Sequence, residues 1–212
     1  MGSHSLAELL KADLEGLARA ARVVAGGGLI CFPTDTLYGL GCDPHNPSAV
    51  RRTMQTKGPR TKPMPILLRD LATAEKFARV SNRARRLAQT FWPGPLTMIL
   101  EARELVPAIL APDGKVGVRS PNHALCLDLL TLCSGALVGT SANLTGKPPA
   151  TTAQEVFQQI GDQVDIILDG GRAPLAVAST VIDLTQPKLT ILREGPLGRE
   201  ELLRSMRRAQ PR

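Results

Sequence analysis

Three polar segments of the sequence carry side chains that could bind a charged ligand. The first, Pro33-Thr-Asp-Thr-Leu-Tyr-Gly39, follows a short apolar run, and α/β proteins often place ligands where a strand opens into a polar turn. Thr34 and Thr36 alternate, so on an extended backbone both hydroxyls point to one face. Tyr38 adds a flat ring with a polar tip. An ordinary Asx/Thr turn without a ligand is the alternative.

The second segment is the basic loop Lys57-Gly-Pro-Arg-Thr-Lys62, which two prolines stiffen. Its three cations are Lys57, Arg60 and Lys62. A triphosphate needs clustered cations in a preset geometry, because ordering a free Lys or Arg side chain costs about 1–2 kcal/mol. The loop is therefore a candidate phosphate-binding site. A mobile surface loop with the same charges is the alternative.

The third segment is Thr140-Ser-Ala-Asn143, which also follows an apolar run. Ser141 and Asn143 can form hydrogen bonds with phosphate or ribose oxygens. The sequence contains neither a G-x-x-x-x-G-K-[ST] loop nor a G-x-G-x-x-G fingerprint. If ATP binds at this segment, neither of the standard phosphate loops binds it.

Positive charge is in excess along the chain. The net charge of +7 favours anionic partners such as nucleotides, pyrophosphate or RNA, while a basic solubilising surface would give the same balance. Aromatic residues make up only 3%, which argues against a surface that stacks nucleic-acid bases. Arg119 and Arg193 each stand at a predicted strand end before a Gly or Pro break. Each is a candidate bidentate anion clamp, with a plain surface arginine as the alternative.

The elements that position these segments are short. Apolar runs predict strands at 29–32, 65–68, 96–100, 117–119, 136–140, 164–168, 179–184 and 189–193. Helical spacing and capping residues predict helices at 6–24, 70–78, 82–91 and 124–133, with others at 48–56 and after Thr152. Asp70, Asn82 and Asn122 are the predicted N-caps of three of them.

The order of these elements predicts the fold class. Helices separate the early strands but not the late ones, which indicates an α/β fold with a mixed sheet. The length fits a single domain over residues 1–212, with a core at about 10–200 and a basic C-terminal helix at about 198–209.

The cysteines and histidines predict no metal site. Cys31, Cys42, Cys126 and Cys133 form no CxxC pair, so buried free thiols are expected, with disulfides as the alternative. The three histidines are far apart and adjoin no acidic cluster. No apolar run is long enough to span a membrane, so a cytoplasmic protein is expected.

Taken together, six segments resemble the L-threonylcarbamoyladenylate synthase family (YrdC/TsaC type). The family shows, in order, P-T-[DE]-T-x-Y-G-L, K-x-R, V-R-x-P, S-x-N, S-T-[VI]-[IV]-D and L-R-x-G. Here these motifs stand at Pro33–Leu40, Lys57–Arg60, Val118–Pro121, Ser141–Asn143, Ser179–Asp183 and Leu192–Gly195. The resemblance covers residues from about 10 to 200. It departs from the family in the basic loop, where Pro59 stands at the usual arginine position and the arginine is Arg60.

The resemblance implies a single twisted α/β domain with a large, positively charged concave site and no additional C-terminal domain. It also implies a nucleotidyltransferase that makes threonylcarbamoyl-AMP and pyrophosphate from L-threonine, bicarbonate and ATP, with Mg²⁺ on the nucleotide. The residues implied to hold threonine are Thr36, Arg119, Gly139 and Ser179. Those implied to hold ATP are Lys57, Arg60, Lys62, Ser141, Asn143 and Arg193, with Lys57 and Arg60 as the catalytic cations.

The implied biological role is the first step of the t6A modification of tRNA, upstream of a t6A transferase machinery. Weak direct binding of tRNA or double-stranded RNA is a further partner expectation. One alternative is an RNA-binding or regulatory protein that kept this fold and lost the synthesis. Another is a related carbamoyl-adenylate enzyme that uses a different acceptor.

Overall fold

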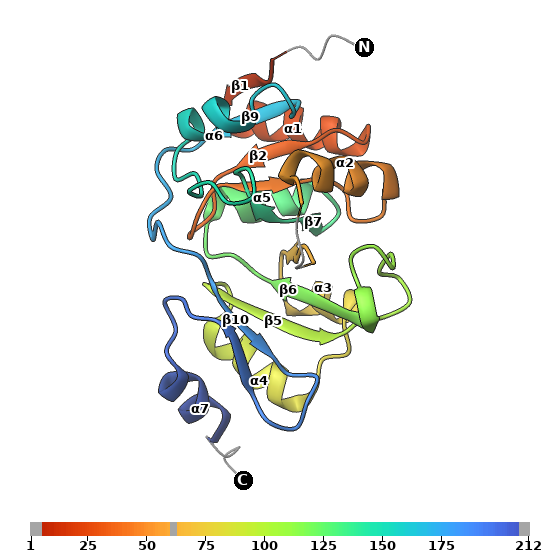
Figure 1. Cartoon of the computed structure of the whole chain (residues 1–212), viewed down its shortest axis with the longest axis vertical. Coiled ribbons are helices and arrows are strands. Elements are labelled where there is room, and N and C mark those ends of the chain that lie inside the picture. The colour runs from red at the N-terminus through yellow and green to blue at the C-terminus, as the bar shows by residue number, and fades with distance from the viewer. Residues whose placement is uncertain (1–5, 60–62, 208–212) are drawn as a thin grey trace.

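The computed structural model describes residues 6–59 and 63–207, and their strands form two mixed sheets (Figure 1). The first has the strand order β1-β9-β2-β3-β8 and lies in the upper half of the figure. The second has the order β11-β10-β5-β6-β4-β7, and its strands β5, β6 and β10 lie in the lower half. The predicted mixed α/β class is confirmed, with the strands divided between two sheets.

The bounds of the elements follow the apolar runs and the caps. The strands of the first sheet are β1 (Glu8–Lys11), β2 (Ile30–Phe32), β3 (Gly39–Gly41), β8 (Thr140–Ser141) and β9 (Ile166–Asp169). Those of the second are β4 (Ile66–Leu68), β5 (Leu96–Glu101), β6 (Lys115–Arg119), β7 (Ala136–Val138), β10 (Thr180–Asp183) and β11 (Thr190–Arg193). The helices are α1 (Leu14–Ala25), α2 (Pro47–Lys57), α3 (Leu71–Phe77), α4 (Asn82–Phe91), α5 (Ala124–Leu132), α6 (Ala153–Ile160) and α7 (Arg199–Arg207), with a short 3₁₀ turn at Pro112–Gly114.

The N-terminal segment corrects one prediction. The helix expected at 6–24 begins only at Leu14, because the Asp13 side chain caps it by accepting a hydrogen bond from the Gly16 amide at 3.0 Å. The preceding residues form β1, which pairs in parallel with β9. Leu6 and Leu9 are exposed, so their helical spacing did not mark a buried helix face.

Two predicted N-caps are also wrong. Asp70 caps α3 as expected, with its carboxylate 2.7 Å from the Thr73 amide. The cap of α4 is Ser81 rather than Asn82, and α5 begins after His123, which makes no side-chain capping bond, rather than after Asn122. In both corrected helices the N-cap lies one residue from the predicted position, the usual error of boundary assignment.

The strand pair β4–β7 ties the core together. Successive residues of a strand face opposite sides. Accordingly Ile66 and Leu68 join the larger apolar cluster, while Leu67 packs with α1 and α5 in the smaller one. The Val138 amide at the end of β7 donates to the Cys42 carbonyl at 2.9 Å, just beyond β3. This bond connects the two sheets directly.

The cysteine prediction is confirmed. All four thiols are free, with Cys31, Cys42 and Cys126 buried and Cys133 half-buried. Burial raises the pKa of Cys42 to about 11, although the Thr53 hydroxyl opposes that shift. Within residues 6–59 and 63–207, no helix combines the length and the apolar character that a membrane span requires.

Candidate active site

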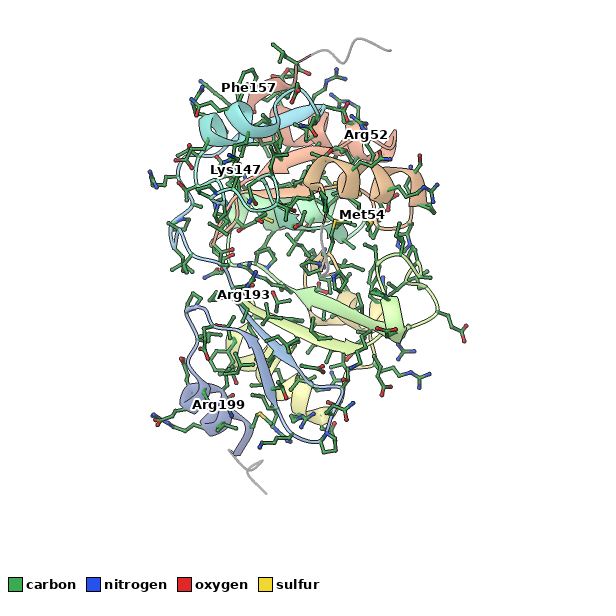
Figure 2. The ribbon with its side chains drawn as sticks, in the orientation of Figure 1. Arg52, Met54, Lys147, Phe157, Arg193 and Arg199 are labelled. Atoms are coloured by element: carbon green, nitrogen blue, oxygen red, sulfur yellow. The ribbon has the colours of Figure 1, made fainter. Side chains whose placement is uncertain are left out.

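A cavity of about 1200 Å³ lies between the two sheets. The first sheet lines it with β3 and β8, and the second with β4, β5, β6, β10 and β11. All six motif segments of the sequence reach it, through Thr36, Lys57, Arg119, Ser141, Ser179 and Arg193. Figure 2 shows Arg193 at the upper end of the lower half, beside this space. Segments far apart in the chain therefore converge on one site.

The predicted site residues fall into three groups. Those that line the cavity are Thr36, Lys57, Arg119, Gly139, Ser141, Ser179 and Arg193. Asn143 is buried but does not line it. Arg60 and Lys62 lie outside the described residues. The prolines on either side of them, Pro59 and Pro63, both line the cavity, so the basic loop meets the cavity wall at both described ends.

Lys57 holds the third polar segment in place. It is the last residue of α2 and only 5% exposed. Its ammonium donates to the Ser141 carbonyl at 2.7 Å and to the Asn143 side-chain oxygen at 2.9 Å, and it also contacts the Asn143 carbonyl. The Asn143 amide nitrogen donates to Leu144 and Lys147 carbonyls at 2.9 and 2.7 Å. Asn143 therefore anchors Lys57 and shapes the loop behind the wall.

Arg119 carries a carboxylate partner from its own chain. Its Nε donates to the Gly94 carbonyl at 3.0 Å and one Nη to the Thr36 hydroxyl at 2.8 Å, while the other Nη donates to Asp35. Both members of the ion pair are buried. Burial lowers the pKa of Arg119 from its usual range, with Asp35 opposing and nearby Arg193 adding to the shift.

The turn after β2 is built by its own hydroxyls. The Thr34 Oγ1 accepts from the Thr36 and Leu37 amides at 3.1 and 3.2 Å and donates to the Leu37 carbonyl at 2.6 Å. Its Oγ1 lies 3.1 Å from that of Thr36, which confirms that both hydroxyls face one side. Thr34 thus shapes the turn, and Thr36 points its hydroxyl at Arg119.

Tyr38 supports this turn from behind. Its ring is fully buried, and burial raises its pKa to about 12. The hydroxyl donates to the Gly171 carbonyl at 2.8 Å and accepts from the Gly170 amide at 3.3 Å. These bonds join the turn to the tight turn that follows β9. Tyr38 lines part of the cavity while its polar tip is occupied by backbone groups.

Ser179 stands in a chain of three polar side chains. Arg193 donates to the Ser179 carbonyl at 2.9 Å and to its hydroxyl at 3.0 Å. The Ser179 hydroxyl lies 2.8 Å from that of Thr97 on β5. All three residues line the cavity. Sequence reasoning missed Thr97, because nothing in its local pattern distinguishes it from any other strand threonine.

Gly139 exposes backbone to the cavity where a side chain would not fit. A Cβ there would lie 2.3 Å from the Leu67 Cγ, a distance that the packed β4 side chain cannot accommodate. The Gly139 amide donates to the Pro65 carbonyl at 2.9 Å. Because the wall is bare backbone here, a ligand can approach it closely.

Asp35 is the second residue that sequence reasoning missed. It lies in the Pro33–Tyr38 turn at the acidic position of that motif. One of its carboxylate oxygens pairs with Arg119, and the other is buried without a hydrogen-bond partner among the described residues. The acidic position directly after a buried strand was the available signal, but its partner lies on another strand.

The cavity wall also carries two carboxylates, Asp113 and Asp183. Asp183 accepts hydrogen bonds from the Thr185 amide and hydroxyl at 2.8 and 2.7 Å and lies 3.6 Å from the Lys115 ammonium. Among the described residues, no three His, Cys, Asp or Glu side chains stand together where they could hold a metal ion. The positive charge expected of the whole cavity stays a prediction.

Comparison with known proteins gives a family match and close relatives. The Sua5_yciO_yrdC family model, described as telomere recombination, matches residues 22–195. The threonylcarbamoyl-AMP synthase of Pyrococcus abyssi is 38% identical over 186 residues, which cover 86% of this chain and 55% of that protein. The putative threonylcarbamoyl-AMP synthase of Mycobacterium tuberculosis is 34% identical over 190 residues, with coverage of 88% and 87%. The chain thus spans about half of the first relative and most of the second.

Solved structures agree with the fold. Pyrococcus abyssi Sua5 complexed with L-threonine superposes with a TM-score of 0.89 at 35% identity, covering 95% of this chain and 61% of that one. Escherichia coli YciO gives a TM-score of 0.84 at 28% identity, with coverage of 90% and 97%. The two-sheet arrangement described above is therefore similar to that of both structures.

Proposed function

This chain belongs to the Sua5/YciO/YrdC family, and from that premise we propose that it is a threonylcarbamoyl-AMP synthase. It would act as an ATP-dependent nucleotidyltransferase on L-threonine and bicarbonate. The observation that carries the proposal is the convergence of six separate motif segments on one cavity wall. The names of the relatives support the choice of reaction.

We place the amino acid at the Arg119 end of the cavity. A guanidinium has five N–H donors, and Gly94, Thr36 and Asp35 engage three of those of Arg119. The remaining donors can bind a carboxylate, which prefers the planar fork of arginine. Thr36, Ser179 and the bare backbone at Gly139 surround the same region and would complete the threonine site.

We place the nucleotide against Lys57, Ser141 and Arg193. Lys57 is fixed by the turn that carries Ser141, so its charge is held in a set position, as charge stabilisation requires. Asn143 would contribute by holding Lys57 rather than by touching ATP. Arg60 and Lys62, outside the described residues, stay proposed phosphate ligands, with Arg60 the second catalytic cation beside Lys57.

The proposed chemistry needs positioning more than a covalent nucleophile. The threonine amine attacks bicarbonate and releases water, which gives a carbamate. A carbamate oxygen then attacks the α-phosphorus of ATP; a new P–O bond forms as the bond to the β-phosphate oxygen breaks and pyrophosphate leaves. Such a displacement depends on alignment and on cations that offset charge developing on the phosphates. Lys57 and Arg60 would supply those cations.

Mg²⁺ is proposed to arrive on the phosphates of ATP, since Mg²⁺ is commonly held by substrate phosphates and few carboxylates. Asp113 and Asp183 line the cavity, and no three His, Cys, Asp or Glu side chains among the described residues stand together as a metal site, so the nucleotide would supply most of the ligands.

The proposed product would enter the t6A modification of tRNA through a downstream transferase. A cytoplasmic location and direct binding of tRNA or double-stranded RNA belong to the same proposal. The alternative of an RNA-binding protein without synthesis is not favoured by the relatives, whose names describe synthases.

Pyrophosphate release by the purified protein tests the function. With ATP and Mg²⁺ present, release should require both L-threonine and bicarbonate, and mass spectrometry should detect threonylcarbamoyl-AMP. Serine in place of threonine tests the acceptor. Absence of threonine-dependent pyrophosphate would refute the synthase, and RNA binding with a steep salt dependence and no nucleotide effect would support the alternative.

Two variants test the placement of the site. Ser141→Ala and Lys57→Met should each lower the rate strongly, with thermal unfolding measured alongside because Lys57 also holds the Thr140–Asn143 turn. Lys188→Ala is the matched control, since Lys188 is exposed and outside the cavity wall. Wild-type rates in both site variants would place the chemistry elsewhere.

A further inference from the structure

Thr97, whose hydroxyl pairs with that of Ser179, has no role in the threonine and nucleotide sites proposed above. Both residues are buried, at 4% and 3% exposure, and both line the cavity. Strands β5 and β10 pair in parallel with Val181 opposite Thr97, so the register of the sheet brings the two hydroxyls to 2.8 Å. The strand register therefore places the two residues close together, and their side-chain rotamers complete the contact.

Arg193 sets the direction of the hydrogen bonds in this pair. It donates to the Ser179 hydroxyl oxygen at 3.0 Å and, being always protonated, it can only donate. A hydroxyl has one proton and two acceptor lone pairs. If Thr97 donates to Ser179 as well, both lone pairs of Ser179 are filled and its proton is left to point into the cavity.

The opposite direction is less favourable when a ligand fills the cavity. If Ser179 donated to Thr97, the buried Thr97 proton would have no acceptor among the described residues, and an unsatisfied buried polar group is destabilising. The charge of Arg193 also polarises the Ser179 hydroxyl and makes it the stronger donor. An anionic acceptor therefore favours the order Thr97 to Ser179 to ligand.

We propose that Thr97 is a positioning residue for the amino-acid substrate: its hydroxyl donates to Ser179, so that the Ser179 hydroxyl donates to a carboxylate-type oxygen of that substrate. This inference rests on the proposed function. It gives the Arg119 end of the cavity a second directed donor, supplied from the β5–β10 pair. Arg119 ends β6, Thr97 lies on β5 and Ser179 directly precedes β10, and β5 lies between the other two strands.

The role separates Thr97 from a merely structural residue. Thr97→Val has nearly the same shape but cannot donate, so Ser179 loses the bond that orients it. The expected effect is a rise of about tenfold in the KM for threonine, the size of one lost hydrogen bond to a directed group. The KM for ATP should stay within twofold of wild type, and Thr97→Ser should restore the wild-type KM for threonine.

The experiment combines threonine titrations of pyrophosphate release with calorimetric binding of threonine to wild type, Thr97→Val and Thr97→Ser. Thr53→Val is the matched control, because Thr53 is a buried, hydrogen-bonded threonine outside the cavity wall. A wild-type KM and Kd for threonine in Thr97→Val would overturn the inference. So would an equal loss in Thr97→Ser, or an equal rise in the KM for ATP.

The same measurements separate failure of the inference from failure of the proposed function. If wild type releases no threonine-dependent pyrophosphate, the synthase proposal fails, and the calorimetric comparison of threonine affinity still decides the role of Thr97. If wild type binds no threonine at all, both fail. If wild type is active and Thr97→Val is unchanged, only the inference fails.

Discussion

Arg119 ends strand β6 and Arg193 ends strand β11, and the two guanidiniums line one cavity from different surroundings. Arg119 is buried and forms an ion pair with Asp35. Arg193 is more exposed, although burial still lowers its pKa from the usual range. Its hydrogen-bond partners are the carbonyl and hydroxyl of Ser179, with no ion pair to it among the described residues. The buried Asp35 carboxylate balances the charge of Arg119, whereas the hydrogen-bond partners of Arg193 are uncharged.

This difference in charge partners indicates different binding roles for Arg119 and Arg193. A ligand carboxylate at Arg119 meets the Asp35 carboxylate behind the guanidinium, so binding there depends on the direction of the remaining N–H donors and on help from Ser179. A phosphate at Arg193 meets no such competitor, so long-range attraction is stronger there. This supports placing the amino acid at Arg119 and the phosphates at Arg193.

The largest expected effect comes from Arg119→Gln. Removing one member of a buried ion pair leaves the other charge uncompensated, so the free energy of unfolding should fall by about 3–5 kcal/mol. The second Asp35 oxygen already lacks a partner among the described residues, so the protein has little to replace the lost cation. Urea denaturation measures the change, and threonine binding by calorimetry should be lost.

A double variant sharpens this prediction. Asp35→Asn together with Arg119→Gln removes both charges, and Asn keeps the shape of Asp, so the double variant should recover most of the lost stability without recovering threonine binding. If the double variant is as unstable as Arg119→Gln alone, the ion pair is not what Arg119 contributes to folding. If the double variant binds threonine with wild-type affinity, Arg119 does not hold the substrate carboxylate.

Arg193→Gln should act on binding and leave folding nearly unchanged. A hydrogen bond to a charged group contributes about 1.5–3 kcal/mol, so the KM for ATP should rise about tenfold or more, while the free energy of unfolding should change by about 0.5 kcal/mol or less. Arg199→Gln, on the exposed first turn of α7 (Figure 2), is the matched control.

Salt sharpens the Arg193 prediction. Because its charge is exposed, the difference in the KM for ATP between wild type and Arg193→Gln should shrink as ionic strength increases. A loss of stability comparable to that of Arg119→Gln would remove the contrast between the two arginines. An unchanged KM for ATP would remove Arg193 from the nucleotide site.

Much of the fold was predictable because the decisive signals are local. Strands β2, β4 and β7 are continuous apolar runs and are buried on both faces. Asp70 marks the start of α3, because its side chain caps the helix. Strand β1 was not predictable, because its pairing with β9 joins distant parts of the chain. The exposed leucines of that segment recur at helical spacing, although they lie in or beside a strand.

The site was predictable as a set of residues but not as a network. Thr36, Arg119 and Ser179 do line one cavity, as the motif pattern implies. Their partners could not be read from the sequence, because Arg119 and Asp35 stand 84 positions apart and Thr97 and Ser179 82 positions apart. Such pairs are set by the register of strands, which no local pattern records.

The smallest expected effect concerns the acid side of the pH profile, through His123. Its Nδ1 is buried without a hydrogen-bond partner among the described residues, and burial lowers its pKa below the usual 6.5, with the Asp35 carboxylate opposing. The unfolded chain therefore takes up a proton more readily than the folded protein just below that pH. By linkage, stability should fall as the pH decreases through about 6.5.

His123→Gln should flatten this part of the profile. Denaturant midpoints between about pH 7.5 and 5.5 measure the slope, and equal slopes in wild type and His123→Gln would contradict the assignment.

The histidine also tests the contrast between the arginines. Since a protonated His123 would place a second cation near Asp35 and weaken its hold on Arg119, the affinity for threonine should decline at a higher pH in wild type than in His123→Gln. The contacts of Arg193 with Ser179 do not involve Asp35, so the affinity for ATP should respond equally in the two proteins.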